Sequence, residues 1–175
     1  VGSGKTVTAS GYALSGAQAG NYTLSAQPTT TADITQAALT VTADAQSATY
    51  GDVLGTLTYS VTSGTLYGAD TLSGALTTAS GGAGTELTNA NGFNVSGSPY
   101  TITQGTLANS NYAITYNSAN LTLSAKGLSI TGFTAGNKAY DGTNTASITS
   151  NGSLSGLETG DTVTINSASA SATFN

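Results

Sequence analysis

The stretch ALTVTA at residues 38–43 decides the fold, because apolar and polar side chains alternate in it without a break. Leu39, Val41 and Ala43 fall on one face of an extended backbone, and two threonines fall on the other. Thr and Val carry branched Cβ atoms that pack well on a pleated surface. The pattern therefore predicts a half-buried β-strand.

The same alternation continues outward along the chain, with turn-forming residues between the runs. Turns are expected at residues 67–70, 91–92 and 151–152, where Gly meets Asn or Asp. We expect an all-β protein of tandem small β-sandwich-like domains, Ig-like or β-grasp-like, in an extended array. The apolar positions of the other runs are Leu57, Tyr59, Val61, Tyr100, Ile102, Tyr112, Ile114, Tyr116, Leu121, Leu123, Leu128 and Ile130.

Five landmarks recur in the same order at separations of 87 to 91 residues. Asn21-Tyr22 returns as Asn111-Tyr112, and ADIT at residue 32 returns as ANLT at residue 119. ALTVTA at residue 38 returns as GLSITG at residue 127, and ATYGD at residue 48 returns as KAYDG at residue 138. LYGADT at residue 66 returns as LETGDT at residue 157. The chain is therefore built from a tandem repeat.

The landmarks divide the chain into a complete unit, residues 38–125, between the back part of a second unit, residues 1–37, and its front part, residues 126–175. Short linkers, Ala37-Ala38 and Ser124-Ala125-Lys126, are expected to limit bending between units. The complementary flanks suggest one period of a longer array. Alternatively, the chain is a fibre subunit that polymerises head to tail by completing a split β-domain. In either case we expect that the two flanks of one copy do not close into one domain.

Composition argues against most chemical functions. Charged residues make up 6% of the chain and the net charge is −5, so we expect no basic surface that could bind nucleic acid or an anionic membrane. The sequence also has no long apolar run, so we expect no insertion into a membrane. The chain has no His and no Cys, which removes the usual proton shuttle and the strongest nucleophile. We expect that it is not an enzyme and uses no cofactor. The carboxylate pairs that a glycosidase would need are Asp70 with Glu86, or Glu158 with Asp161.

Two stiffening devices remain open as alternatives. Ca²⁺ at domain junctions would use carboxylates near turns, although no calcium-loop motif is present. A Lys–Asn cross-link would need a buried lysine, and the complete unit contains none. The calcium candidates are Asp52, Asp70, Asp141, Glu158 and Asp161, and the cross-link candidates are Lys5, Lys126 and Lys138.

Recurring turn motifs are the candidate structural site. In Tyr50-Gly51-Asp52 and Tyr140-Asp141-Gly142 we expect the Asp to cap a turn and the Gly to supply a positive φ angle. The tyrosines of these motifs, and those of Asn21-Tyr22 and Asn111-Tyr112, recur at equivalent positions. Recurrence predicts that all four tyrosines pack in a core rather than contact sugars.

These motifs resemble two families of bacterial surface-protein repeats, MBG and YDG. The resemblance to an MBG unit lies in the stretches LTVTADAQSATYGD and SPYTITQGTLANSNYAITY. The resemblance to a split YDG unit lies in the stretches KAYDGTNTASI and VGSGKTVTASGYALSGAQAGNYTL. The resemblance implies a stalk or filament segment of a large secreted or surface adhesin, of the kind with filamentous-haemagglutinin-like regions. It also implies an extracellular or cell-surface location and no catalytic residues.

Two kinds of partner follow from this resemblance. A spacer would contact neighbouring copies of the same repeat. The alternative is an adhesive module that binds a glycan or a protein on a host or biofilm surface. Such a module would use exposed tyrosines or the Gly- and Asn-rich segment 78–92, which is longer than expected for an MBG unit and is predicted to be a variable loop.

Overall fold

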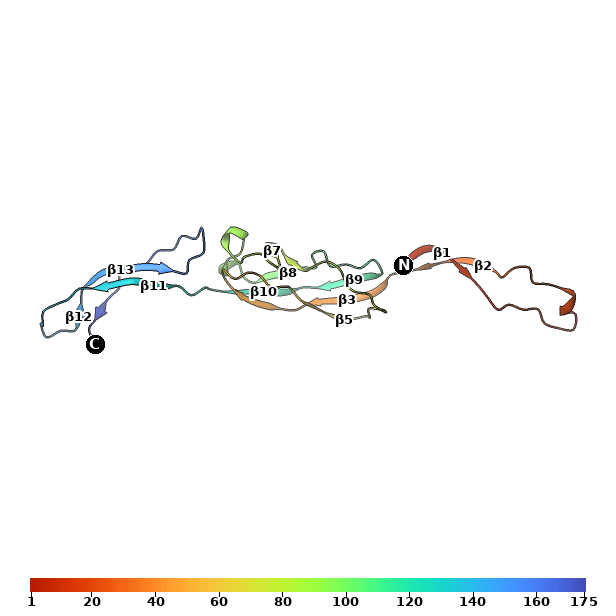
Figure 1. Cartoon of the computed structure of the whole chain (residues 1–175), viewed down its shortest axis with the longest axis horizontal. Helices are drawn as coiled ribbons and strands as arrows, with labels where there is room; N and C mark the ends of the chain where they lie inside the picture. The colour runs from red at the N-terminus through yellow and green to blue at the C-terminus, as the bar shows by residue number, and fades with distance from the viewer.

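The computed structural model describes residues 1–175 and is all-β apart from three short 3₁₀ helices. Figure 1 shows three parts one after another along the longest axis. We call them the N-terminal arm (residues 1–36), the central domain (residues 37–124) and the C-terminal arm (residues 125–175). The 3₁₀ helices are η1 (Ala19–Asn21), η2 (Asn89–Asn91) and η3 (Val95–Gly97). None of them has the length or apolar character of a membrane-spanning helix.

The central domain contains two three-stranded sheets, ordered β5-β3-β9 and β4-β10-β8. Each sheet has one antiparallel pair, β3 with β5 or β10 with β8. Each also has one parallel pair, β3 with β9 or β4 with β10. A two-stranded ribbon, β6 with β7, lies between β5 and β8 in sequence. The strands are β3 (Ala37–Ala43), β4 (Gln46–Thr49), β5 (Tyr59–Ser63), β6 (Thr77–Thr78), β7 (Gly81–Gly82), β8 (Tyr100–Ile102), β9 (Tyr112–Asn117) and β10 (Ala119–Ser124).

The core lies entirely in the central domain, where thirteen buried apolar residues, from both sheets and from the segments between their strands, form one cluster. The stretch ALTVTA supplies Leu39, Val41 and Ala43 to this cluster, so the predicted inward face of the strand is confirmed. Segments without regular alternation supply five more core residues, which the sequence pattern did not identify: Leu54, Leu76, Leu87, Phe93 and Leu107.

The N-terminal arm is a long hairpin in which β1 (Gly2–Thr8) pairs antiparallel with β2 (Thr29–Ile34). The C-terminal arm is similar. Its β11 (Ser129–Ala135) pairs antiparallel with β13 (Ile148–Ser155), and the short strands β12 (Thr145–Ala146) and β14 (Ala172–Thr173) pair near the end. Neither arm has a buried residue.

Three core predictions are wrong in this structure. Leu128 and Ile130, at the start of the C-terminal arm, are exposed because no second sheet covers β11. Val61 is exposed because it lies on β5, an edge strand of its sheet. Segment 78–92, which is predicted to be a variable loop, is anchored to the core: Leu87 within it is fully buried, and its backbone N–H donates to the Asp52 carbonyl oxygen at 2.8 Å.

The two flanks do not close into one domain within the chain, as expected. No strand of one arm pairs with a strand of the other. Figure 1 places the N-terminal and C-terminal arms at opposite ends of the central domain. The all-β class is therefore confirmed, with a single complete core between two arms that lack one.

Candidate functional site

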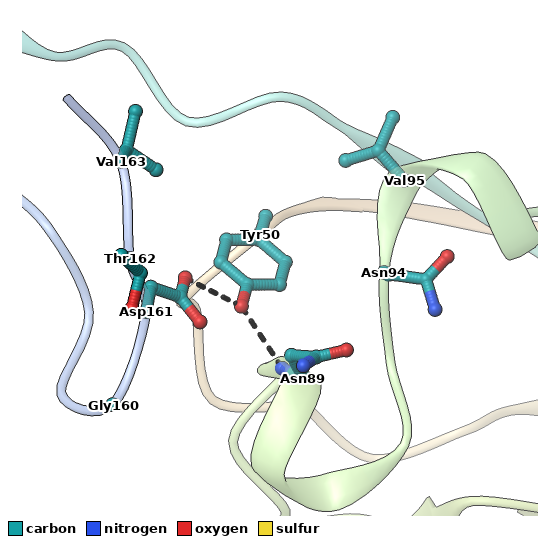
Figure 2. Close-up of a pocket in the computed structure, with 8 residues that line it drawn as sticks. All are labelled: Tyr50, Asn89, Asn94, Val95, Gly160, Asp161, Thr162 and Val163. Carbon is teal, nitrogen blue, oxygen red and sulfur yellow. Dashed lines mark hydrogen bonds between the residues drawn. The ribbon is translucent and has the colours of Figure 1, made fainter. Parts of the chain in front are cut away.

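The site lies where the central domain meets the C-terminal arm, as Figure 2 shows. Tyr50 follows β4 and points toward Asp161 of the arm. The Tyr50 hydroxyl donates to Asp161 Oδ2 at 2.7 Å and accepts from the backbone N–H of Asn89 at 2.9 Å. One side chain therefore links the end of a sheet, a 3₁₀ helix of the same domain and the next part of the chain.

A tight turn places Tyr50 at this junction. The Asp52 N–H donates to the Thr49 carbonyl oxygen, and the Thr49 N–H donates to Asp52 Oδ2, each at 3.0 Å. Gly51 has a φ of 90°, which favours glycine, and a Cβ atom there would collide with the Glu158 carboxylate. The positive φ angle is therefore the reason for glycine in this turn, since the Glu158 carboxylate stands at the end of a flexible side chain and could move aside.

A salt bridge between Lys126 and Glu158 supports the same junction. Lys126 belongs to the three-residue linker, while Glu158 lies on the turn that also presents Asp161. Both side chains are partly exposed, so the pair contributes about 0–1 kcal/mol and weakens with salt. Both residues belong to the C-terminal arm, so the pair connects its turn to the segment that follows β10.

Burial raises the pKa of Tyr50 above its usual value, and the neighbouring Asp161 carboxylate raises it further. Both effects oppose ionisation, because a tyrosinate would lose its hydrogen bond to Asp161 and would stand beside a second negative charge. The phenol is therefore neutral at physiological pH and serves as a hydrogen-bond donor.

The junction contains an open cleft of about 510 Å³, with Val95 and Val163 on its walls. Asp161 is the one carboxylate among its lining residues, and it is already bonded to Tyr50. A glycosidase would need two carboxylates across such a cleft. This arrangement can hold the C-terminal arm in a fixed position against the central domain. The cleft offers no pair of carboxylates for acid–base catalysis.

The other predicted carboxylates have partners of their own, although Glu158 and Asp161 share a turn in which the Asp161 N–H donates to the Glu158 carbonyl oxygen at 3.1 Å. Asp70 accepts a hydrogen bond from Tyr112 within the central domain, and Glu158 pairs with Lys126. No three acidic side chains come together in a group that could hold a metal ion. The calcium alternative therefore gains no geometric support. All three lysines are exposed, so none is the buried lysine that a Lys–Asn cross-link requires.

The turn at Tyr140-Asp141-Gly142 has its own capping bonds. Asp141 Oδ1 accepts from the N–H and hydroxyl of Thr143 at 3.0 and 2.9 Å, and it pairs with Lys138 at 2.7 Å. The Lys138 ammonium and then the Thr143 donors hold the pKa of Asp141 below its usual value. Gly142 has a φ of 76°.

The two Asn-Tyr motifs have different surroundings. Tyr112 is buried, donates to Asp70 Oδ2 at 2.9 Å and accepts from the Tyr67 N–H at 2.7 Å. Asn111 Nδ2 donates to the same Asp70 oxygen at 3.4 Å. In the N-terminal arm, Asn21 is the last residue of η1 and Tyr22 follows it, and both are exposed.

The prediction that four tyrosines pack in a core is therefore confirmed for Tyr112 alone, since Tyr50 lines the open cleft at the junction. Tyr22 and Tyr140 are exposed, whereas Tyr112 is buried and Tyr50 is half-buried. The physical reason is the position of each residue: the exposed pair belongs to the two arms, which have no second sheet to cover them. From the sequence, Asp161 is a candidate only for catalysis or calcium binding, because no local pattern connects it with Tyr50.

Comparison with known families agrees with this division of the chain into a complete domain and two arms. The MBG domain (YGX type) matches residues 39–122, and the YDG domain matches residues 1–32 together with 124–175. Searches of curated proteins and of solved structures found no match. Both families are repeat-type domains of surface proteins. The chain is therefore similar to one MBG domain that stands between the two parts of a YDG domain.

Proposed function

We propose that this chain is a non-catalytic structural repeat of an extracellular bacterial adhesin, where it forms a segment of a stalk or filament. The observation that carries the proposal is the order of the parts in Figure 1: the complete domain stands between two arms that leave it at opposite ends. Each added copy would then add length. The families support the proposal, since both are repeat-type domains of surface proteins.

The junction supports a mechanical role. The short segment between β10 and β11 and the Tyr50–Asp161 hydrogen bond hold the C-terminal arm against the end of the central domain, and the Lys126–Glu158 salt bridge supports the arm beside them. Such contacts restrict bending without burying a large surface. Threonine and serine hydroxyls keep the surface hydrated although charged residues are only 6% of the chain. Neighbouring copies of the repeat are the proposed partners.

Replacement within a surface-displayed array tests this function. One copy of the repeat would be exchanged for an unrelated rigid β-domain of equal length, and a deletion of the same copy would serve as the matched control. A spacer predicts that deletion shortens the stalk and reduces adhesion, while the exchange restores both. Adhesion that stays lost after the exchange, with stalk length restored by electron microscopy, would show instead that the repeat itself binds a surface.

A further inference from the structure

The central domain shows what joins the front and back halves of one repeat. Its front half contains β3, β4 and β5, and its back half contains β8, β9 and β10. Both antiparallel pairs lie within a half. Both parallel pairs cross between the halves: Leu39 of β3 faces Ile114 of β9, and Gln46 of β4 faces Leu121 of β10. Closing the domain therefore means forming two parallel pairs.

Each arm contains the antiparallel pair of one half and lacks both parallel pairs. In the C-terminal arm, β11 pairs with β13 and Ile130 faces Leu154, as Val41 faces Val61 in the central domain. In the N-terminal arm, β1 pairs with β2, as β8 pairs with β10. The second edges of β11 and β2 have no partner strand. An unpaired edge is a template for another strand.

Side-chain exposure shows the same incompleteness at equivalent positions of the repeat. Leu39 and Val41 are 1% and 0% exposed, whereas Leu128 and Ile130 of β11 are 39% and 53% exposed. On the other half, Tyr112 and Leu121 are 4% and 0% exposed, whereas Tyr22 and Ile34 are 71% and 57% exposed. Residues that form the core in the complete domain are uncovered in the arms.

We propose that the C-terminal arm of one copy and the N-terminal arm of a second copy close one YDG domain by forming the two missing parallel pairs. This inference rests on the proposed spacer function and names the partner as another copy of the chain. The repeat fixes the register. Leu128 would face Leu24, as Leu39 faces Ile114, and Gly136 would face Ile34, as Gln46 faces Leu121.

Apolar hollows on both arms fit this closure. Ile130 and Phe133 line a hollow of about 290 Å³ on the C-terminal arm, together with Ile148. Leu14 and Tyr22 line a hollow of about 190 Å³ on the N-terminal arm. In the central domain the corresponding faces of the two halves share one core. Covering these exposed surfaces is the driving force of the association.

A polar contact adds specificity to the apolar surface. In the central domain the Tyr112 hydroxyl donates to Asp70, and in the repeat these residues correspond to Tyr22 and Asp161. Asp161 uses Oδ2 for Tyr50, so Oδ1 is available to accept from the Tyr22 hydroxyl of the second copy. Asp161 then connects three elements: the preceding domain and both halves of the closed one.

Cysteine cross-linking tests the register, and the chain has no native cysteine to interfere. Thr40 faces Thr115 in the central domain, so Ser129 of one copy is expected to face Ser25 of another. Adjacent strands lie about 4.8 Å apart, within the Cα separation that a disulfide spans. Full-length Ser25→Cys and Ser129→Cys chains, mixed and oxidised, are expected to form a covalent dimer. Ser153→Cys, on the paired far side of β11, is the matched control for Ser129→Cys.

Three results would overturn the proposal. The first is the absence of a covalent dimer. The second is that Ser25→Cys cross-links to the Ser153→Cys control as well as it does to Ser129→Cys. The third is a disulfide within one chain of the Ser25→Cys/Ser129→Cys double variant in dilute solution, since the arms would then close on themselves. All three leave the stalk-exchange experiment unaffected, so failure here is distinguishable from failure of the spacer function.

Sedimentation of the unmodified chain gives an independent test. Contact between unlike surfaces generates open chains rather than a closed dimer, so the oligomer size is expected to grow with concentration. Ile130→Asn is expected to weaken association at least tenfold. Val53→Asn, at a residue of similar exposure in the central domain, is expected to leave it unchanged. Equal effects of both variants, or a monomer at every concentration, would contradict the proposal.

Discussion

At the scale of single residues, the hydroxyl of Tyr112 stabilises the central domain through two bonds at once. It donates to Asp70 and accepts from the backbone N–H of Tyr67. We expect Tyr112→Phe to lower the free energy of unfolding by about 1–3 kcal/mol, because it leaves a partly buried donor and acceptor unpaired. Urea denaturation measures this loss. Tyr67→Phe is the matched control, because the exposed Tyr67 hydroxyl makes no hydrogen bond, and its effect is expected to stay within about 0.5 kcal/mol.

Tyr50 gives the junction a dependence on alkaline pH. Burial and Asp161 raise the folded-state pKa of Tyr50 above its unfolded value. A raised pKa means that the stabilisation is complete below the unfolded pKa and is lost as the pH rises through the folded pKa. Ultraviolet absorbance reports tyrosine ionisation as the pH rises. Subtracting the titration curve of Tyr50→Phe from that of the native chain isolates Tyr50, and the midpoint of this difference is expected to lie above 10, the usual pKa of tyrosine.

Asp161→Asn separates the two causes of that shift. Removing the charge is expected to lower the Tyr50 midpoint without returning it to the usual value, because burial is the larger cause. An unchanged midpoint would mean that the arm does not contact Tyr50 in solution.

At the scale of elements, the same strand has a different energetic role in the central domain and in an arm. Leu121 of β10 is fully buried, while Ile34, at the equivalent position of β2, is exposed. We expect Leu121→Ala to destabilise the central domain by about 2–5 kcal/mol through the cavity it leaves. Ile34→Ala is expected to change the unfolding of the dilute chain by less than about 0.5 kcal/mol. Equal losses would show that the N-terminal arm already has a core of its own.

Alternation of apolar and polar residues predicts a strand well where one face of the strand packs on the core and the other face is exposed to solvent. Leu39, Val41 and Ala43 were predicted on the inward face of β3 because a threonine follows each of the first two. Phe93 and Leu87 could not be predicted in this way, since they lie in irregular segments whose burial depends on where the chain returns to the sheets. The same limit applies to the junction. Tyr50 and Asp161 are 111 residues apart, and no local pattern connects them.

At the scale of the whole molecule, the repeat implies that the junction in Figure 2 occurs twice per period. Tyr50 and Asp161 connect the central domain to the arm that follows it. Their equivalents are Tyr140 and Asp70, so in an assembled fibre Tyr140 would contact Asp70 in the central domain of the second copy. Tyr140 is 96% exposed, and Asp70 uses one carboxylate oxygen for Tyr112 and Asn111, which leaves the other available.

Tyr140→Phe tests this second junction in the assembled protein. The change removes a joint between domains without touching the proposed closing surface, so oligomer mass at a given concentration is expected to stay constant while the fibres bend more. Curvature along fibres in electron micrographs measures the bending, and Tyr12→Phe, at another exposed tyrosine of an arm, is the control. Fibres of unchanged stiffness would mean that the two junctions differ despite their common sequence pattern. If Tyr140→Phe instead dissociated the oligomers, Tyr140 would belong to the closing surface itself and the register derived from the repeat would be wrong.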